Sequence, residues 1–283
     1  MQFHNPNADL FVPDGVEETA ALARTTHLGI SAHQDDLEIM AYHGIAHCFG
    51  RSDQWFTGVV VTNGAGSPRA GLYAAYTDAE MQEVRRREQR KAALVGEYAA
   101  QIQLDYTSAE VKNPQHPGVV DDLGAILRAA RPQTVYLHNP ADKHDTHVAV
   151  VLRAIAALRR LAGEYRPAKV YGCEVWRDLD WVPDEDQQPL PVSARPNLAA
   201  GLLGVFDSQI SGGKRYDLAT LGRRMANATY LASHGIDIET ALTLALDLTP
   251  LIDDPNLSVS AYTLRIVDKF RADIAARLAK LGA

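Results

Sequence analysis

Residues 26–49 read THLGISAHQDDLEIMAYHGIAHCF and combine a β-prone run with a helical pattern. The run 26–31 has the length and apolar character of a buried strand, whereas apolar residues recur at helical spacing from 37 to 49. A polar turn, AHQDD at 32–36, joins the two. The stretch therefore predicts a strand, a turn and a helix, which is the repeating unit of an α/β protein.

The same alternation continues along the chain. Further strands are expected at 57–62, 101–106, 134–138, 168–176 and 202–207, and helices at 78–99, 118–130, 147–162 and 214–233. This order predicts a mostly parallel sheet flanked by helices. The acidic, proline-bearing segment 178–196 is expected to be a surface loop, the type of 239–255 stays open, and an amphipathic helix is expected near 262–281. We expect one main domain, 1–235, followed by a small C-terminal extension, 236–283.

Composition narrows the class of protein. The chain has 283 residues, of which 46% are hydrophobic, enough for one large core or a core with a smaller appended part. The formal net charge is -7 and no stretch concentrates lysine and arginine, so nucleic acid is not an expected partner. Cys48 and Cys173 are the only cysteines, which argues against a disulfide framework. No signal-peptide-like run and no stretch of about 18 apolar residues occurs, so we expect a cytoplasmic protein without membrane contact.

Histidine and aspartate gather in two short segments. His33 lies beside Asp35 and Asp36 in AHQDD, and His144 and His147 begin and end HDTH at 144–147. Each segment follows an expected strand and opens an expected helix. Because ligands of open α/β sheets bind beyond the carboxyl ends of the strands, we expect the two segments to meet in space.

The spacing of these residues suits a divalent metal ion. His33 and Asp36 are three residues apart, so they point the same way if the turn tightens into a helical turn, and His147 adds a second imidazole. Two nitrogens and one carboxylate oxygen leave coordination positions for water and substrate, as in catalytic zinc sites. Iron or manganese would accept the same donors.

Two further residues are candidates for proton transfer. Asp35, next to the expected ligands, is positioned to act as general base toward the attacking water. His144, one helical turn from His147, is positioned to stabilise the tetrahedral intermediate or to protonate the leaving nitrogen. Asp142 or Asp145 would orient one of these two imidazoles, and the sequence leaves open which carboxylate and which imidazole form the pair.

These segments resemble those of the PIG-L/LmbE-like zinc-dependent N-deacetylases, which carry AHPDD-type and HPDH-type segments where this chain has AHQDD and HDTH. The resemblance extends to VTNGAG at 61–66, to Arg85 and Glu88 in an Arg-x-x-Glu pattern, and weakly to the Asp207-Ser208-Gln209 element. It spans roughly residues 26–235. It implies a Rossmann-like (LmbE-like) sheet that does not bind a dinucleotide.

The resemblance also implies roles for individual residues. The zinc ligands that it implies, for one ion per chain, are His33, Asp36 and His147. Asp35 would be the general base. Gln34 stands where the family has proline, which leaves the ligand types in place. Asp145-Thr146 stands where the family has Pro-Asp, so the orienting role of that aspartate passes to Asp145 or is lost.

Simpler interpretations exist for single residues. Two adjacent aspartates are typical of a helix N-terminus, and His138 at the end of a strand is expected to be structural. Arg85 is either a substrate contact or part of the charged helix face RRREQRK. Trp176 is the tryptophan best placed to stack on a sugar ring. Matching donors at two separate strand-to-helix turns favour a metal site over independent caps.

The expected function is that of a zinc hydrolase that removes an N-acetyl or related acyl group from an amino-sugar-containing small molecule. The sugar part rests on the resemblance alone. The alternatives are an amidase of a thiol conjugate or peptide-like metabolite, and a metal-binding or glycan-binding protein without turnover. The segment 236–283 has no counterpart that we can place in the family, and we expect it to shape substrate choice or the assembly of a homo-oligomer.

Overall fold

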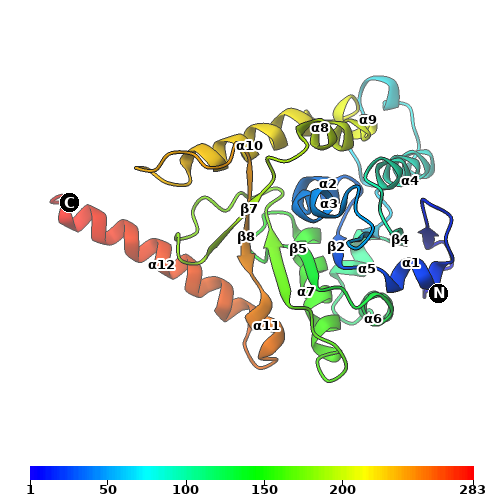
Figure 1. Cartoon of the computed structure of the whole chain (residues 1–283), viewed down its shortest axis with the longest axis horizontal. Coiled ribbons are helices and arrows are strands. Elements are labelled where there is room, and N and C mark those ends of the chain that lie inside the picture. The colour runs from blue at the N-terminus through cyan, green and yellow to red at the C-terminus, as the bar shows by residue number, and fades with distance from the viewer.

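An eight-stranded sheet runs through the molecule, with helices on both faces (Figure 1), in a computed structural model that describes residues 1–283. The strand order is β1-β4-β3-β2-β5-β6-β8-β7. The central strands are parallel: β4 (Ala100–Tyr106), β3 (Phe56–Thr62), β2 (His27–Ser31), β5 (Thr134–His138) and β6 (Lys169–Cys173). The antiparallel strands are β1 (Asp9–Phe11), β8 (Leu242–Asp247) and β7 (Gln187–Pro191). The predicted mostly parallel, Rossmann-like sheet is confirmed.

The strand order reverses beside β2. From β2 the chain moves outward through β3 to β4, and it then returns to place β5 against the other side of β2. The carboxyl ends of β2 and β5 therefore diverge into a crevice, which is where α/β sheets bind ligands. The turns that follow these two strands carry the histidines singled out above.

Two layers of helices cover the sheet (Figure 1). One layer, with a core cluster of 37 buried residues, contains α1 (Glu18–Ala23), α5 (Ser108–Lys112), α6 (Gly118–Ala130), α7 (Asp145–Arg160) and α11 (Thr249–Asp253). The other, with 22 buried residues, contains α2 (Asp36–Met40), α3 (Tyr42–Cys48), α4 (Asp78–Val95), α8 (Pro196–Gly204), α9 (Asp207–Ile210) and α10 (Tyr216–Tyr230). A single-turn 3-10 helix, η1 (Gly71–Tyr73), lies in the loop before α4.

Local sequence explains where the longer helices begin. Thr77 caps α4 through a reciprocal capping box with Glu80, which satisfies backbone N–H groups at the helix start. Pro196 occupies the first turn of α8, where a missing N–H costs no hydrogen bond. In α7 the buried positions recur every three or four residues and face the sheet, so burial of this stripe fixes the helix at the crevice.

Three details differ from the sequence predictions. The strand predicted at 202–207 is wrong, because the apolar residues there continue the buried face of α8, where Ala199, Leu202 and Leu203 follow helical spacing. The expected helix over 37–49 is two helices that meet at Ala41. The expected loop 178–196 contains β7, an edge strand whose two prolines hid its pattern.

The C-terminal segment divides its residues between the sheet and solvent. β8 lies between β6 and β7, so part of the expected extension 236–283 completes the sheet. The final helix, α12 (Val259–Lys280), then leaves the body of the molecule (Figure 1), and every residue from 271 to 283 is exposed. The division at residue 235 stays a prediction.

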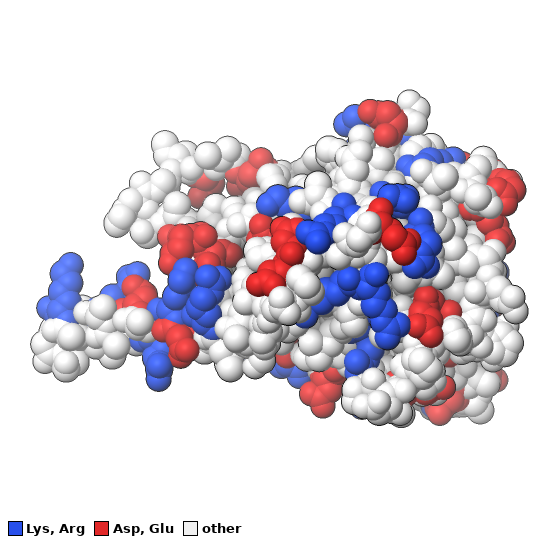
Figure 2. All heavy atoms as spheres, turned by 90° about the horizontal axis from the view of Figure 1, so that it is seen from below, with Lys and Arg blue, Asp and Glu red and all other residues white.

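Basic and acidic side chains alternate over the face shown in Figure 2, without a large area of one sign. Many of the surface charges are paired, for example Arg128 with Glu164 at 2.9 Å and Arg160 with Asp121 at 2.8 Å. None of the helices combines the length and the apolar character needed to cross a lipid bilayer.

Candidate metal centre

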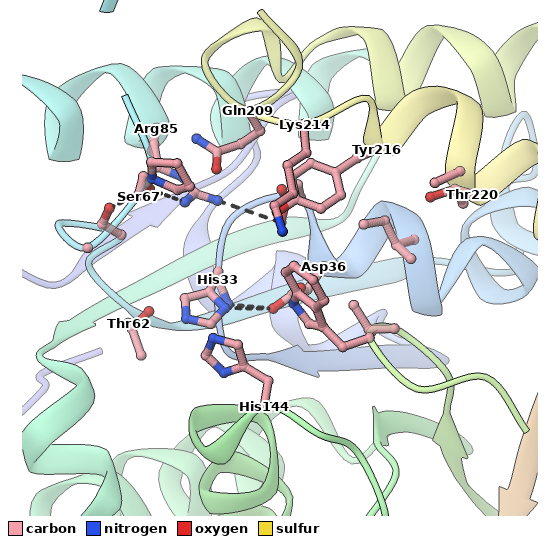
Figure 3. A pocket seen from close by; sticks show the side chains of 18 of the residues that line it. His33, Asp36, Thr62, Ser67, Arg85, His144, Gln209, Lys214, Tyr216 and Thr220 are labelled. Atoms are coloured by element: carbon pink, nitrogen blue, oxygen red, sulfur yellow. Dashed lines mark hydrogen bonds and ion pairs between the residues drawn. The ribbon is translucent and has the colours of Figure 1, made fainter. Parts of the chain in front are cut away.

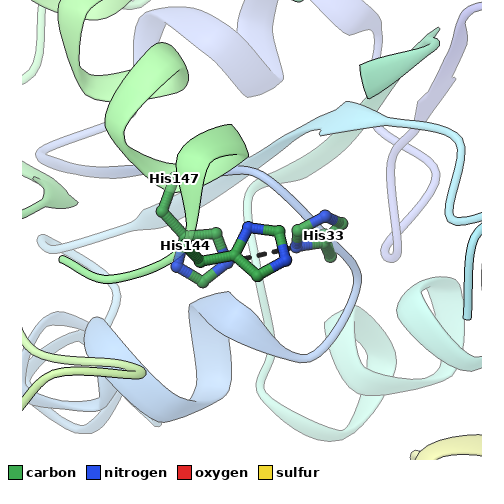
Figure 4. A group of neighbouring side chains, drawn as sticks. All are labelled: His33, His144 and His147. Atoms are coloured by element: carbon green, nitrogen blue, oxygen red, sulfur yellow. Dashed lines mark hydrogen bonds between the residues drawn. The ribbon is translucent and has the colours of Figure 1, made fainter. Parts of the chain in front are cut away.

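The two histidine-bearing turns meet at the carboxyl ends of β2 and β5, as expected. His33 lies in the turn after β2, and Asp36 is the first residue of α2. His147 lies in the first turn of α7, which follows β5. Figure 3 shows His33 beside Asp36, and Figure 4 shows His33 and His147 pointing toward each other from different segments of the chain.

The donor atoms of the three expected ligands form a nearly equilateral triangle. The Nδ1 atom of His33 lies 3.2 Å from Oδ2 of Asp36 and 3.2 Å from Nε2 of His147. The third side, from Nε2 of His147 to Oδ2 of Asp36, is 3.3 Å. Zinc bonds of about 2.0–2.1 Å at tetrahedral angles place two donors about 3.3 Å apart. The triangle therefore fits a tetrahedrally bound divalent metal.

The protonation states of His33 and Asp36 suit metal binding. Burial lowers the pKa of His33 to about 4, so its imidazole is neutral at neutral pH. Burial opposes the charge of Asp36, but the imidazoles of His147 and His33 outweigh it and hold the pKa of Asp36 below its usual value. Asp36 thus offers a carboxylate and His33 a free lone pair, which are the ligand forms that a divalent metal requires. Burial opposes the charge of His147, but Asp36 and Asp142 outweigh it and raise the pKa of His147, so metal binding there displaces a proton.

Asp142 orients His147. Its Oδ2 atom lies 3.3 Å from Nδ1 of His147, and its other oxygen accepts the backbone N–H of His144 at 3.1 Å. The imidazole therefore carries its proton on Nδ1 and directs the Nε2 lone pair toward His33 and Asp36. The sequence had left open which carboxylate pairs with which imidazole, and the geometry joins Asp142 to His147.

His138 lies beside these ligands, but it hydrogen-bonds to the backbone instead of facing the metal position. It is fully buried, and its ring stacks on that of His147 at 3.9 Å between centroids. Donor-atom spacing also groups it with Asp36 and His147 as potential metal ligands. However, its Nε2 atom accepts the backbone N–H of Ala32 at 2.8 Å, which uses the lone pair that a metal would need. This contact ties β5 to the turn after β2, in keeping with the structural role expected for His138.

Asp35 caps α2 with a backbone that is unusual for a residue with a side chain. Its φ is +90°, in the left-handed region, and its N–H donates to Oε1 of Gln89 at 3.3 Å. The carboxylate lines the pocket 3.6 Å from the guanidinium of Arg85. Burial and the neighbouring charge of Asp36 raise the pKa of Asp35, although Arg85 opposes the shift. A carboxylate with a raised pKa at this position can accept a proton.

His144 faces the pocket from the N-cap position of α7. Its ring centroid lies 4.6 Å from that of His147 and 5.1 Å from that of His33, and its buried Nδ1 atom has no hydrogen-bond partner (Figure 4). It also forms a second group of potential metal ligands with His33 and His147. His144 is therefore placed either to contact a substrate or to join the metal ligands.

Arg85 braces the turn that carries the ligands. It is 3% exposed and donates to the backbone oxygen of Gln34 and the hydroxyl of Ser67. One helical turn later, Glu88 accepts the N–H and the hydroxyl of Ser208 at 2.7 and 2.6 Å. The Arg-x-x-Glu and Ser-Gln segments thus contact each other beside the site. Gln34 is also buried there and donates to the backbone oxygen of Thr62 at 3.3 Å.

The site opens into a pocket of about 660 Å³ (Figure 3). The lining includes the predicted residues His33, Asp35, Asp36, Arg85, His144 and Trp176, while His147 lies buried beneath it. Sequence reasoning missed Lys143, Lys214, Arg215, Tyr216 and Arg223, which also line it. The missed residues carry no local motif, and four of them come from the turn before α10 and the first half of that helix, far along the chain. Tyr216 keeps its hydroxyl proton, because burial and the nearby Asp35 and Asp36 raise its pKa to about 12.

Comparison with protein families gives one match. Residues 28–158 match the PIG-L family, described as GlcNAc-PI de-N-acetylase. The matched segment contains both histidine-bearing turns and Arg85. The predicted resemblance is confirmed. No curated protein matches the sequence.

Several solved structures share the fold at low sequence identity. The 4-carboxy-2-hydroxymuconate hydratase GalB from Pseudomonas putida KT2440 is 18% identical with a TM-score of 0.61, and the match covers 83% of this chain and 99% of that one. The N,N'-diacetylchitobiose deacetylase from Pyrococcus horikoshii is 16% identical with a TM-score of 0.59, over 78% and 84% of the two chains. The conserved protein TT1542 from Thermus thermophilus is 20% identical with a TM-score of 0.57, over 76% and 92%.

Proposed function

We propose that the chain is a zinc-dependent hydrolase that removes an N-acetyl or related acyl group from an amino-sugar-containing small molecule, because the segment 28–158 matches the PIG-L family. The observation that carries the proposal is the triangle of His33, Asp36 and His147 donor atoms, with sides of 3.2–3.3 Å, at the floor of an open pocket. The deacetylase from Pyrococcus horikoshii, whose fold this chain shares, supports the choice of reaction.

The proposed metal ligands are His33, Asp36 and His147. A zinc ion held there would lower the pKa of a water molecule and polarise the amide carbonyl. Asp142 supports this role of His147 by fixing the proton on Nδ1. Iron or manganese would supply the same chemistry to the same donors.

The chain's own residues move the protons. Asp35 accepts the proton of the attacking water, a role that fits its raised pKa and its place in the pocket wall. Arg85 holds the Asp35 carboxylate in place from 3.6 Å. His144, on the α7 side of the pocket, donates to the oxygen or the departing nitrogen as the amide bond breaks. Trp176 offers its ring as a wall for the substrate.

The proposal is tested by measuring bound metal together with free-amine and acetate release from N-acetylglucosamine conjugates. We expect about one metal ion per chain and release of both products by the wild type. Asp35→Asn keeps a residue that tolerates positive φ, so it should retain the metal but lose roughly 10²–10⁴-fold in kcat. Asp145→Asn, which changes an exposed carboxylate on the same helix as His147, is the matched control. Bound metal without amine release from any N-acyl compound would count against the proposal.

A second candidate function is the addition of water to an unsaturated acid. The hydratase GalB, with a match that covers 99% of its chain, supports it, and the basic residues of the pocket suit a carboxylate. An amidase of a thiol conjugate or peptide-like metabolite, and a binding protein without turnover, are the remaining alternatives. Product analysis separates the two hydrolases from the hydratase and the binding protein, because only amide hydrolysis releases an amine, and hydration adds one water without cleaving the substrate. The N-acyl compound that is cleaved then distinguishes the deacetylase from the other amidase.

A further inference from the structure

The pocket carries a positive charge that contrasts with the chain as a whole. The formal net charge of the protein is -7. The pocket wall contains only two acidic side chains, Asp35 and Asp36, but five basic ones: Arg85, Lys143, Lys214, Arg215 and Arg223. Both aspartates lie at the proposed catalytic centre, so every other charged side chain of the wall is basic.

Most of the pocket charges already have partners within the protein. Asp36 contacts the imidazoles of His33 and His147, and Asp35 faces Arg85 at 3.6 Å. Arg215 forms an ion pair with Asp217 at 2.7 Å. Arg223 donates to the backbone oxygen of Val175. These contacts account for both acids and for three of the five cations.

Lys143 and Lys214 are different, because neither ammonium group has a hydrogen-bond acceptor or a carboxylate partner within the protein, and both residues are exposed. Lys143 immediately precedes His144 at the start of α7. Lys214 lies in the turn before α10, and its Nζ atom is held 4.5 Å from the centroid of the Trp176 ring. That ring lies 6.2 Å from the ring of His144, so it connects Lys214 to the proposed catalytic histidine. Figure 3 shows Lys214 and Tyr216 on one side of the pocket and His144 on the other.

We infer that the substrate of this site carries an anionic group, a phosphate or a carboxylate, which Lys143 and Lys214 bind while the acyl-nitrogen bond lies beside Asp35 and His144. Only the placement of the acyl-nitrogen bond beside Asp35 and His144 rests on the proposed hydrolysis. Lysine ammonium groups are compact point charges with three donors each, which suits either anion. Unpaired cations on the wall of a recessed site also concentrate anions there. A pocket of about 660 Å³ has room for such a group beyond the reacting amide.

The test compares matched neutral and anionic compounds. N-acetylglucosamine, its 6-phosphate and its 3-O-lactyl ether are assayed with the metal-loaded wild type. We expect kcat/KM to be at least tenfold higher for an anionic member than for the neutral sugar. We also expect the KM of that anionic member to rise with added KCl, while that of the neutral sugar stays constant. Comparison of kcat/KM for the 6-phosphate and for the lactyl ether shows which anion the site prefers.

Lysine substitutions locate the effect. Lys143→Met and Lys214→Met keep the apolar stem and remove the charge, so each should lower the ratio of kcat/KM for the anionic member to that for the neutral sugar about tenfold. Lys91→Met, at an exposed position on α4 outside the pocket, is the matched control. Equal kcat/KM for neutral and anionic members, or an unchanged preference in both pocket variants, would overturn the inference.

Failure of the hydrolase proposal is distinguished by binding. If no member is hydrolysed, calorimetric binding of glucosamine 6-phosphate and glucosamine to the metal-loaded protein decides the inference alone. Tighter binding of the phosphate, weakened in Lys143→Met and Lys214→Met, supports an anion site without hydrolysis. Equal binding of the two sugars, or no binding of the phosphate at millimolar concentration, overturns it.

Discussion

The Nδ1 atom of His33 lies 3.2 Å from the Nε2 atom of His147, although 114 positions separate the two residues in the chain. The contact exists because β2 and β5 are neighbours at the point where the strand order reverses. Each imidazole is therefore placed by its own strand-to-helix turn, and the proposed metal site depends on the pairing of these two strands. The residues that hold the turns are as important as the ligands.

Asp142→Asn tests the orientation of His147. The carboxylate lies 3.3 Å from Nδ1 of His147, and its other oxygen accepts the N–H of His144. An asparagine amide is uncharged and has one acceptor oxygen, so it cannot serve both donors. We expect metal affinity to fall about 10–100-fold with little change in fold. Competition with a chromogenic chelator measures the affinity. Asp145→Asn, on the same helix as His147, is the control. Equal metal affinities for the two variants would contradict the assignment of Asp142 to His147.

Gly64→Ala tests the loop beside the turn. Gly64 has a φ of +73°, and a Cβ atom there would lie 2.6 Å from Oε1 of Gln34 and 2.9 Å from Cδ of Arg85. We expect the free energy of unfolding to fall by about 1–3 kcal/mol. Gly66→Ala is the matched control, because a Cβ atom at Gly66 meets nothing within 4 Å. Denaturant unfolding compares the two, and a Gly64→Ala protein as stable as the control would refute the prediction.

Acid should destabilise the protein in part through His43. Burial and the nearby His47 lower the pKa of His43 from 6.5 to about 4. In the unfolded chain His43 takes up a proton near pH 6.5, whereas in the folded chain it does so only near pH 4. The contribution of His43 to the free energy of unfolding, about 3 kcal/mol in total, is therefore present above pH 6.5 and is lost as the pH falls toward 4.

His43→Gln isolates this contribution. The side-chain amide of glutamine can still form a hydrogen bond with the hydroxyl of Tyr136, which lies 2.8 Å from Nδ1 of His43. We expect the free energy of unfolding to depend less on pH between 6.5 and 4 in the variant, by about one bound proton. Urea unfolding at several pH values measures the slope. The same slope in both proteins would show that His43 titrates normally in the fold.

Removal of residues 271–283 tests the end of α12. All of these residues are exposed, among them Ile274, Leu278 and Leu281 at 42%, 52% and 83%. In a monomer, we expect a chain that ends at residue 270 to keep its free energy of unfolding within about 0.5 kcal/mol. Light scattering of the full chain determines the oligomeric state in parallel. A larger loss of stability would show that the segment packs against another chain in solution.

The parallel core of the fold could be predicted because its signals are local. The strands over 134–138 and 57–62 are short apolar runs, and the helix over 118–130 matches α6 at both ends. The edge strands could not be predicted in this way. β7 gains its hydrogen bonds only from β8, and its prolines are tolerated because it lies at the edge of the sheet.

The candidate site also combines residues with local sequence signals and residues placed only by tertiary contacts. His33 and Asp36 share one turn, so their spacing alone indicated a metal, whereas Lys214 and Tyr216 reach the pocket through the packing of α10 over α2 and carry no pattern of their own. The orienting role of Asp142 needed distances, since Asp145 is closer in sequence to both imidazoles and yet Asp142 contacts His147. Ligand spacing is encoded locally, and the shape of the pocket is encoded by tertiary contacts.

The left-handed backbone at Asp35 has a consequence for protein engineering. At φ of +90°, residues other than glycine, asparagine and aspartate carry a steric penalty before their chemistry matters. A saturation library at position 35 is therefore restricted twice, first by the backbone conformation and then by the carboxylate that the proposed general-base role requires. Aspartate alone satisfies both restrictions, so glutamate, the usual conservative exchange, is a poor substitute here.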